Sequence, residues 1–349
     1  CYFKKAAPEA RRWDCCYWNP ANNVNEWTAG LAPNFPFPAD NRAAWAHWET
    51  YLNNILDAVG DLGNVLFDLG NELKTDMAWI DWTIGIMEAW EAKNGIKLVK
   101  GLDCTHMNDA AKVLGHPKLD VIMTHGEYID DAPLLRTLFG KPVVSVISRD
   151  MPHGISGRLG YLGLGEEGST ADRFRHFHYR CLMNKVQGVG DYGKMMGGQD
   201  PNRAGDLQTI SRVDPASEEV RAFAAQSKLL SAFFETIRDY EALKQMNDLV
   251  LAAPCKAYCL KSNRELLVYL DAGKLARSGA VPASHVRILL KHNDPLLAGG
   301  TEAIMWDPAS GRRAKISFTT EPAAQTEQFV ELTVQVPSFP SDLMLHFRC

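Results

Sequence analysis

The hydrophobic pattern of this 349-residue chain changes its period near Pro254, and this change constrains the fold more than any other feature. Before it, short apolar runs such as Val143 to Ile147 are separated by segments whose apolar residues recur at helical spacing. After it, apolar and polar residues alternate, as in Val330 to Val336. Strands separated by helices are typical of a parallel sheet, and alternating runs are typical of antiparallel strands. We therefore predict an α/β domain over residues 1–252 and a β-sandwich domain over residues 253–349.

The first domain is predicted to repeat a strand–helix unit, with Gly60 ending its first helix. The expected helices cover residues 40–59, 76–93, 109–114, 132–139, 170–185 and 217–238, and the expected strands cover residues 64–70, 96–102, 119–124, 141–148 and 187–192. Tryptophans at helical spacing are expected to belong to the core; they are Trp45, Trp48, Trp79, Trp82 and Trp90. In the second domain, the alternating runs predict a small antiparallel β-sandwich of about 95 residues.

Composition excludes several classes of protein. Hydrophobic residues make up 46% and charged residues 23% of the chain, which favours a packed core over disorder. The net charge of −5 lacks the basic excess of nucleic-acid-binding proteins, so no nucleic-acid partner is expected. Apolar runs are only strand-sized, so no membrane span is expected. The eight cysteines contain no CxxC pair and are interpreted either as buried thiols or as disulfides.

Ionisable and polar residues follow the predicted strands. Residues at the carboxyl ends of parallel strands in an α/β barrel form its active site. The strand ends read Gly70 to Glu72, Asp103 to His106, Thr124 to Tyr128, Ser148 to Asp150 and Asp191 to Tyr192. Glu72 with Asp150 or Glu127 would supply the two carboxylates that glycoside hydrolysis uses. The alternative for Glu72 is a carboxylate that only stabilises the start of the following helix.

The run Asn64 to Glu72 resembles the strand-four motif of the clan A glycoside hydrolases, which are cellulase- and mannanase-like (β/α)8 barrels. The loop Trp18 to Asn25 and the strand Lys141 to Val146 also look like these enzymes. The stretches Ala257 to Leu260, Leu267 to Leu270 and Met305 to Pro308 resemble the collagen-binding-type β-sandwich that follows the barrel in some members. The resemblance implies that Glu72 is the general acid/base and that Asn71 contacts the sugar 2-hydroxyl.

Two departures from the family are visible. The family nucleophile is a Glu at the end of strand seven, but the corresponding segment here ends in Ser148-Arg149-Asp150. Either Asp150 takes this role, Glu127 serves instead, or the retaining mechanism is absent. In addition, only residues 1–40 are left to supply strands one to three, for which a complete barrel would use roughly 100 residues. We therefore expect an N-terminally incomplete (β/α)8 TIM-barrel-like domain, either truncated or completed by a partner chain or a second copy.

Further residues are expected to bind substrate. Aromatic rings in loops, at Trp18 and Tyr128, suit stacking on sugar rings, and His106 and His125 suit hydrogen bonds to hydroxyl groups. The expected substrate-binding residues are Asn71, His125, Glu127, Tyr128, Trp18, Asn23 and His106. Neither an HExxH motif nor a closely spaced Cys/His set occurs, so we expect no metal ion and no cofactor. His176 and His178 fall on different faces of a helix that is expected to be solvated.

The sequence thus predicts a glycoside hydrolase that acts on an oligo- or polysaccharide, with Glu72 and Asp150 as its catalytic residues. The alternative is a non-catalytic carbohydrate-binding or surface-assembly protein with a degenerate barrel. The resemblance implies an extracellular, periplasmic or cell-surface location. The first residue is Cys1 rather than Met, which is expected from a processed or truncated end and also matches a mature bacterial lipoprotein.

Overall fold

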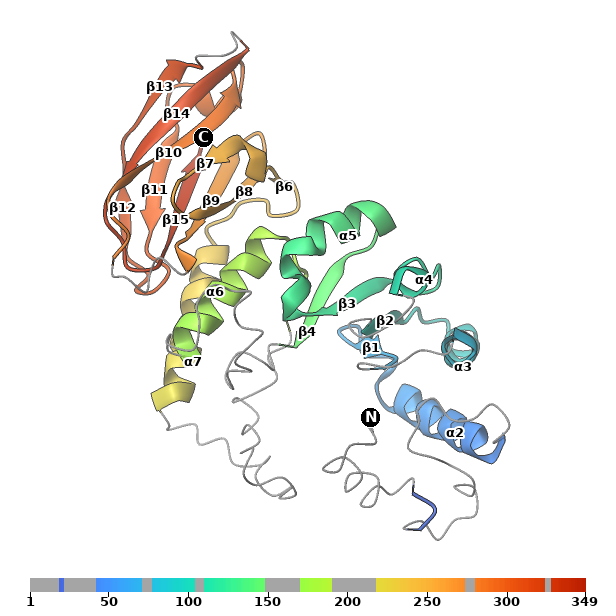
Figure 1. Ribbon diagram of the computed structural model, residues 1–349. Helices are drawn as coiled ribbons and strands as arrows, with labels where there is room; N and C mark the ends of the chain where they lie inside the picture. Colours follow the sequence, from blue (N-terminus) through green and yellow to red (C-terminus); the bar gives the residue numbers. More distant parts are fainter. Residues whose placement is uncertain are drawn as a thin grey trace. The chain divides into compact units, whose positions relative to one another are not determined.

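The computed structural model describes residues 19–21, 42–70, 77–103, 110–147, 170–189, 218–273, 280–323 and 328–349. Two compact units divide the chain. The first comprises residues 1–125 and 134–144, and the second comprises residues 126–133 and 145–349. Figure 1 labels the helices and strands of both units, and each unit is described by itself below.

A five-stranded sheet begins in the first unit, and its spatial order β1-β2-β3-β4-β5 is also the order along the chain. β1 pairs in parallel with β2, and β2 with β3. Strands added in chain order are typical of the winding of a (β/α) barrel, whereas a doubly wound sheet reverses its order. Closure into a barrel stays a prediction. The strands are β1 (Leu66–Asp68), β2 (Val99–Asp103), β3 (Val121–His125), β4 (Val143–Ile147) and β5 (Gly188–Val189).

The predicted helices of the first unit are confirmed to within a few residues. They are α2 (Arg42–Val59), α3 (Met77–Asn94) and α4 (Ala110–Leu114), while α5 (Ala132–Phe139) starts in the second unit and continues into the first. The amide of Gly60 bonds the carbonyl of Leu56 at 2.7 Å, so the expected helix end is confirmed. α3 ends at Gly95, whose φ of +68° is a left-handed conformation that glycine adopts without strain.

α2 and α3 cover one face of the sheet with an apolar core. Leu56, Trp79 and Met87 from the helices pack in one cluster with Leu102 and Phe67 from the strands. Trp79 and Trp90 are buried, as predicted, whereas the other three tryptophans are only partly buried against the same cluster. These three are Trp45, Trp48 and Trp82.

A buried ion pair fastens β2 to α3 within this layer. The ammonium group of Lys100 is fully buried and lies 2.6 Å from Glu91 Oε1. The same carboxylate accepts a hydrogen bond from the amide of Leu98 at 2.7 Å. Burial lowers the pKa of Lys100, and the hydrogen bond to Glu91 opposes that shift. A buried charge that loses its partner is strongly destabilising, so this pair ties helix and strand together.

The second unit contains the antiparallel β-sandwich that the alternating pattern predicts. Its four-stranded sheet has the order β13-β14-β10-β7, and its six-stranded sheet has the order β12-β11-β15-β9-β8-β6. The core between the sheets includes Val268, Leu345 and Phe347 from one and Ile288 and Val334 from the other. The strands are β6 (Lys244–Gln245), β7 (Val250–Leu251), β8 (Lys256–Lys261), β9 (Glu265–Asp271), β10 (Ser284–Lys291), β11 (Glu302–Trp306), β12 (Arg313–Lys315), β13 (Phe318–Pro322), β14 (Phe329–Val336) and β15 (Asp342–Arg348).

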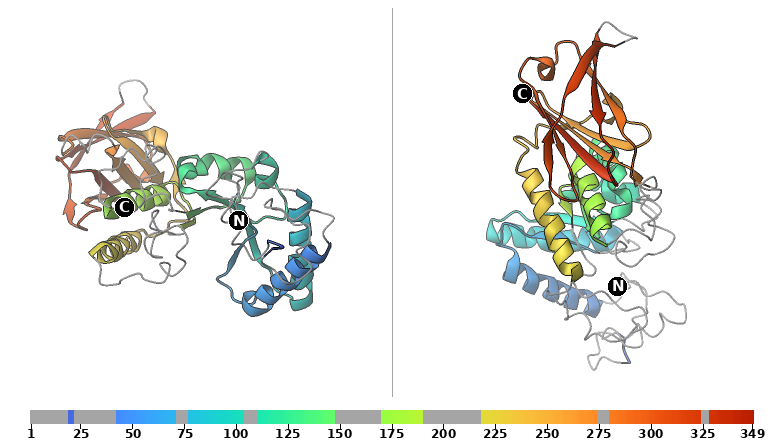
Figure 2. Two further views of the ribbon diagram at one scale, coloured as in Figure 1. Left: turned by 60° about the horizontal axis from the view of Figure 1, so that its bottom comes forward. Right: turned by 90° about the vertical axis from the view of Figure 1, so that its left-hand side faces the viewer.

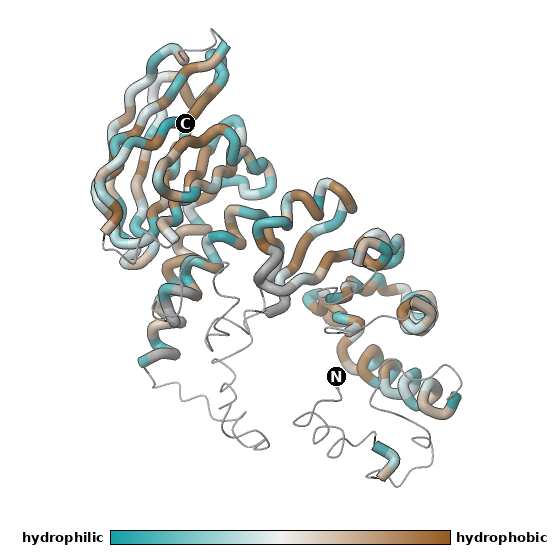
Figure 3. Tube along the Cα trace, in the orientation of Figure 1, coloured by the Kyte–Doolittle hydropathy of each residue, from teal (hydrophilic) through white to brown (hydrophobic). Residues whose placement is uncertain are grey.

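Helices α6 (Thr170–Met183) and α7 (Glu218–Phe234) lie side by side and form a third layer of the second unit (Figures 1 and 2). Tyr179 and Phe233 from this helix pair pack against Leu267, Tyr269 and Met344 of the six-stranded sheet. Every residue of β9 is therefore buried, on one side by the opposite sheet and on the other by the helices. The hydropathy along these strands can be followed in Figure 3.

The sandwich sheets also begin earlier in the chain than expected. β6 starts at Lys244 and belongs to the six-stranded sheet, and β7 belongs to the four-stranded sheet. The division of the chain at residues 252 and 253 stays a prediction. Four cysteines are described and carry free thiols, namely Cys181, Cys255, Cys259 and Cys349. Among the helices that the structure describes, none combines the length and the apolar character that crossing a membrane requires.

Candidate functional site

The carboxyl ends of the strands lie where the sequence predicts them. β1 ends at Asp68, β2 at Asp103, β3 at His125 and β4 at Ile147. Parallel pairing brings the ends of β1, β2 and β3 to one edge of the sheet. The segments that follow these ends contain Asn71-Glu72, His106, Glu127-Tyr128 and Asp150. The edge is therefore the first candidate functional site.

Strand register shows which side chains point away from the helices. Phe67, Lys100 and Leu102 contact the helical layer, so the alternate positions belong to the opposite face. Register pairs Asp68 with Gly101, and Asp103 with Met123. Asp68 and Asp103 therefore lie on the face of the sheet that α2 and α3 do not cover. In a barrel this face is the interior.

These two aspartates differ in environment. Asp103 is completely buried, whereas Asp68 is exposed and accepts a hydrogen bond from the amide of Gly70 at 3.0 Å. Asp68 is not among the predicted site residues, although its alternate position in Leu66-Phe67-Asp68 was the signal that could have placed it on this face. A carboxylate four residues before Glu72 is a further candidate for contact with a polar ligand.

Most predicted site residues fall outside the described part of the chain. They are Trp18, Asn23, Asn71, Glu72, His106 and Asp150. His125 ends β3, and Glu127 and Tyr128 belong to the 3-10 turn η2 (Gly126–Asp131), but only their backbone is described. The carboxylate pair and the substrate subsites stay predictions.

A second group of polar residues, which the sequence did not indicate, lies between α6 and the six-stranded sheet. This buried polar layer consists of Arg175, His176, Tyr269, Asp271 and Asp342. The Arg175 guanidinium donates to both carboxylate oxygens of Asp342, through Nε to Oδ2 at 3.1 Å and through Nη2 to Oδ1 at 3.0 Å. His176 Nδ1 lies 3.3 Å from Asp271 Oδ1, and the Tyr269 hydroxyl donates to Asp342 Oδ2 at 3.2 Å.

Charges in this layer set the pKa of His176. Burial disfavours the imidazolium, but attraction to Asp342 and the hydrogen bond to Asp271 outweigh it, so the pKa is raised. Burial likewise acts to raise the pKa of Asp271, but its hydrogen bond with His176 and the positive charges of His176 and Arg180 outweigh burial, so its pKa is lowered. The layer therefore favours an ion pair between a charged His176 and a charged Asp271.

The expectation that this helix is solvated around His176 is wrong. His176 is only 1% exposed, because it lies against Asp271, Asp342 and Tyr269 of the six-stranded sheet. His178 is half-buried and lies with its ring 3.8 Å from that of Phe174. The polar positions of β9 and β15 alternate with apolar ones and therefore looked solvent-facing in the sequence. They instead meet polar residues of α6, which no local pattern reveals.

His346 on β15 is buried in a different setting. Its Nε2 atom lies 3.1 Å from Glu265 Oε1, and the Glu265 carboxylate also accepts hydrogen bonds from the amide of Arg238 at 3.0 and 3.2 Å. Burial lowers the pKa of His346, and the hydrogen bond to Glu265 offsets only part of this effect. The pKa values of His176 and His346 are thus shifted in opposite directions.

Asp130 in η2 forms a third cluster, also inside the second unit. Its Oδ2 atom accepts hydrogen bonds from Arg180 and from Lys256 Nζ, the latter at 2.8 Å. Its Oδ1 atom accepts from the Tyr258 hydroxyl at 3.1 Å and from Asn184 Nδ2 at 3.2 Å. Burial acts to raise the pKa of Asp130, but Arg180 and Lys256 outweigh it and lower the pKa.

The described residues contain no group of three or more His, Cys, Asp or Glu side chains that could hold a metal ion. On the helical side of the first unit, α2 and α3 form an open hollow of about 360 Å³. The rings of Trp45 and Trp82 line it with centroids 4.4 Å apart, together with Arg42, Ala46 and Glu49. This hollow lies on the opposite side of the sheet from the face that carries Asp68 and Asp103.

Solved structures share this fold at low sequence identity. The chain is similar to a cycloisomaltooligosaccharide glucanotransferase from Paenibacillus sp., solved with cycloisomaltoheptaose, at a TM-score of 0.51 and 10% identity. That match covers 86% of this chain and 65% of the other, so this chain spans less than two thirds of the length of that enzyme. At this identity the match shows a common fold and says nothing of activity.

A second similar structure is trehalose-6-phosphate hydrolase from Bacillus licheniformis, at 10% identity and a TM-score of 0.46. The match covers 87% of this chain and 69% of that one, and its TM-score is too low to support an argument. No protein-family model and no curated protein sequence matches the chain.

Proposed function

We propose that this protein acts on O-glycosidic bonds of an oligo- or polysaccharide. The observation that carries the proposal is the coincidence of the strand ends with the sequence motif. Asn71-Glu72 begins three residues after the end of β1, and Asp150 lies three residues after the end of β4, in a sheet whose strands are added in chain order. The fold shared with a glucanotransferase supports the same assignment.

Glu72 would act first as general acid, giving its proton to the oxygen of the leaving sugar, and then as general base for the incoming water. Asp150 would attack the anomeric carbon or stabilise the positive charge that develops there. Asn71, His125, Glu127, Tyr128, His106, Trp18 and Asn23 would contact the sugar. Asp103 and Asp68 are additional candidates for hydrogen bonds to sugar hydroxyls.

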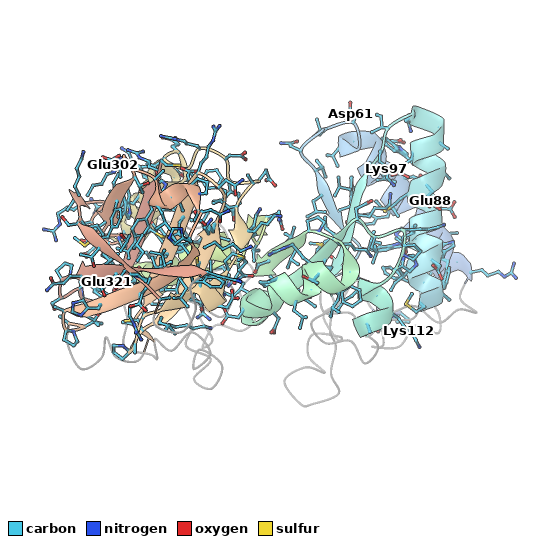
Figure 4. The ribbon with its side chains drawn as sticks, turned by 90° about the horizontal axis from the view of Figure 1, so that it is seen from above. Asp61, Glu88, Lys97, Lys112, Glu302 and Glu321 are labelled. Atoms are coloured by element: carbon cyan, nitrogen blue, oxygen red, sulfur yellow. The ribbon has the colours of Figure 1, made fainter. Side chains whose placement is uncertain are left out.

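The test compares wild type with Glu72→Gln on α-glucans, β-glucans and aryl glycosides. Removing a general acid/base is expected to lower kcat by about 10²- to 10⁴-fold. Glu321→Gln is the matched control, because Glu321 is an exposed glutamate on β13 of the sandwich (Figure 4). Equal rates for wild type and Glu72→Gln on a hydrolysed substrate would remove Glu72 from the mechanism.

One observation favours a second function, the binding of carbohydrate without turnover. The segment Ser148-Arg149-Asp150 lacks the glutamate that serves as nucleophile in the enzymes that the sequence resembles. Calorimetric titration with the same glycans separates the two. Binding heats without product formation support the binding protein, and product formation by wild type supports the enzyme.

The proposal has an architectural part as well. We propose that the sheet β1 to β5 closes into a barrel, either within the chain or with a second copy or a partner chain, and that the protein works outside the cytoplasm. Light scattering of the purified protein at several concentrations separates a monomer from an assembly. A monomer at all concentrations would exclude closure with a second copy and leave closure within the chain or with a partner chain.

A further inference from the structure

The η2 turn has little intrinsic stability. It is a 3-10 helix of six residues, and 3-10 runs longer than three or four residues are uncommon because their hydrogen bonds are poorly aligned. Its conformation must therefore depend on tertiary contacts. Two neighbouring residues of η2 supply them. Ile129 is 2% exposed, and Asp130 receives four hydrogen bonds.

The four donors to Asp130 come from two different layers of the second unit. Arg180 and Asn184 lie on α6 or directly after its end, while Lys256 and Tyr258 lie on β8 of the six-stranded sheet. Each carboxylate oxygen accepts two of the four bonds, so the acceptor capacity of Asp130 is well used. Asn184 also accepts a hydrogen bond from Gln245 of β6 at 2.6 Å, which extends the network along the sheet.

The negative charge of Asp130 is needed to keep Arg180 and Lys256 close together beside η2. Two cations, Arg180 and Lys256, face one carboxylate, and the Arg180 side chain is only 5% exposed. Both cations also lie near the ring of Tyr258, at 5.7 and 4.9 Å from its centroid. Without the Asp130 charge, the two cations would repel each other beside the turn, and the buried Arg180 would lose the carboxylate to which it is hydrogen-bonded.

We propose that Asp130 is a positioning residue through which α6 and strand β8 of the sandwich hold the turn that carries Glu127 and Tyr128. In a 3-10 helix the period is three residues, so the backbone of Glu127 lies one turn before that of Asp130. Fixing Asp130 therefore fixes the backbone at Glu127 and Tyr128. This inference rests on the proposed function, in which these two residues bind the sugar, and it gives the sandwich a part in forming the site.

The test measures hydrogen exchange in wild type, in Asp130→Asn and in the double variant Lys256→Met/Tyr258→Phe. Asp130→Asn keeps the shape of the side chain and removes its charge. We expect exchange of the amides of residues 126–131 to rise by about tenfold or more, which is the change expected when a charge-assisted hydrogen bond is lost. The double variant, which removes only the donors from β8, should raise exchange in the same segment by a smaller factor.

Combining the substitution at Asp130 with those on β8 tests whether β8 acts on the turn through Asp130. If β8 acts through Asp130, adding Lys256→Met/Tyr258→Phe to Asp130→Asn should cause no further rise in exchange. Glu302→Gln is the control, because Glu302 pairs with Lys315 and Arg348 elsewhere in the same sheet (Figure 4). The proposal would be overturned if exchange is unchanged in folded Asp130→Asn or if it rises equally in Glu302→Gln. It would also be overturned if the effects of Asp130→Asn and Lys256→Met/Tyr258→Phe on exchange are additive. If Asp130→Asn does not fold, the double variant decides by the same readout.

Kinetics add a readout that general destabilisation would not produce. On a glycan that wild type hydrolyses, Asp130→Asn should raise KM more than it lowers kcat, because Glu127 and Tyr128 are assigned to binding. A loss confined to kcat would overturn the assignment. Hydrogen exchange can be measured without turnover. If exchange rises in Asp130→Asn but wild type has no glycosidase activity, the proposed function is rejected and the positioning role of Asp130 is kept.

Discussion

His176 on α6 and His346 on β15 both lie between the helices and the six-stranded sheet, yet different charges face them. Asp342, Asp271, Arg175 and Tyr269 surround His176, and the two carboxylates outweigh burial and raise its pKa. Glu265, Arg348 and Arg238 face His346, and burial prevails there and lowers its pKa. Because a pKa that differs between the folded and unfolded states makes stability depend on pH, the two residues should act in opposite directions.

The first prediction concerns these opposite effects. The contribution of His176 is fully present below its unfolded pKa of about 6.5 and is lost as the pH rises through the higher folded pKa. The contribution of His346 is present above about pH 6.5 and is lost as the pH falls through its lower folded pKa. Each residue changes the free energy of unfolding by at most about 1.4 kcal/mol per pH unit, which is the value for one proton.

The pH dependence of the free energy of unfolding is measured by urea unfolding of wild type, His176→Gln and His346→Gln between about pH 5 and pH 9. This range includes the unfolded pKa of histidine. His176→Gln should remove a fall in stability above about pH 6.5, and His346→Gln should remove a fall below it. The lowered pKa values of Asp130 and Asp271 act only as the pH drops below about 4, outside this range. An unchanged alkaline slope in His176→Gln would contradict the assignment of the pKa shift.

At the scale of elements, α7 shows how two adjacent residues of the same type divide their roles. Phe233 is 1% exposed and packs against Tyr179, Trp306 and His346, with ring centroids 5.4 to 6.2 Å away. Phe234 is 44% exposed and has its ring 5.1 Å from that of Tyr240. The helix is thus attached to the six-stranded sheet through one face.

The second prediction compares the two phenylalanines. Phe233→Ala should lower the free energy of unfolding by about 3 to 5 kcal/mol, because it leaves a cavity in the layer between helix and sheet. Phe234→Ala should cost clearly less than Phe233→Ala, since Phe234 is 44% exposed and loses less buried area. Urea unfolding followed by circular dichroism gives both values. Similar losses in the two variants would mean that α7 is not attached in this way.

Most elements could be predicted from the sequence, because each has a clear period and a glycine or turn at its end. The order of strands and helices from Arg42 to Phe139 and the antiparallel strands after Pro254 agree with the prediction. The third layer of the second unit could not be predicted. The polar residues of β9 and β15 have the spacing of a solvated face, and only tertiary contact with Arg175 and His176 shows that this face is buried.

The candidate site was predictable in part for the same reason. Strand ends follow from local apolar runs, so the edge that precedes Glu72 and Asp150 could be located from the sequence. The role of Asp130 could not, since its donors come from residues 50 to 128 positions away in the chain. Contacts at such distances leave no spacing in the sequence.

At the scale of the whole molecule, the two units contain cores that share no residue. The buried cluster of the first unit lies between Leu52 and Leu119, and the clusters of the second lie between Tyr179 and Phe347. Mutations in separate cores without shared partners usually have additive effects on stability. Each unit should therefore respond mainly to changes in its own core.

The last prediction tests this with calorimetry on the full chain. Glu91→Gln removes the carboxylate beside the buried Lys100 and should cost the first unit about 3 kcal/mol. Neutralising Lys100 at pH 7 instead would cost about 4.6 kcal/mol for a lysine of ordinary pKa, which sets the upper limit. Lys97→Met is the control, because Lys97 lies 3.5 Å from the same carboxylate but is 69% exposed, and it should cost less than about 1 kcal/mol (Figure 4).

We expect Glu91→Gln to lower the Tm of one calorimetric transition by several degrees and Phe233→Ala to lower that of another. The double variant should show both shifts at their single-variant sizes, because the changes lie in separate clusters. A single transition that both variants lower equally would show instead that the units unfold together.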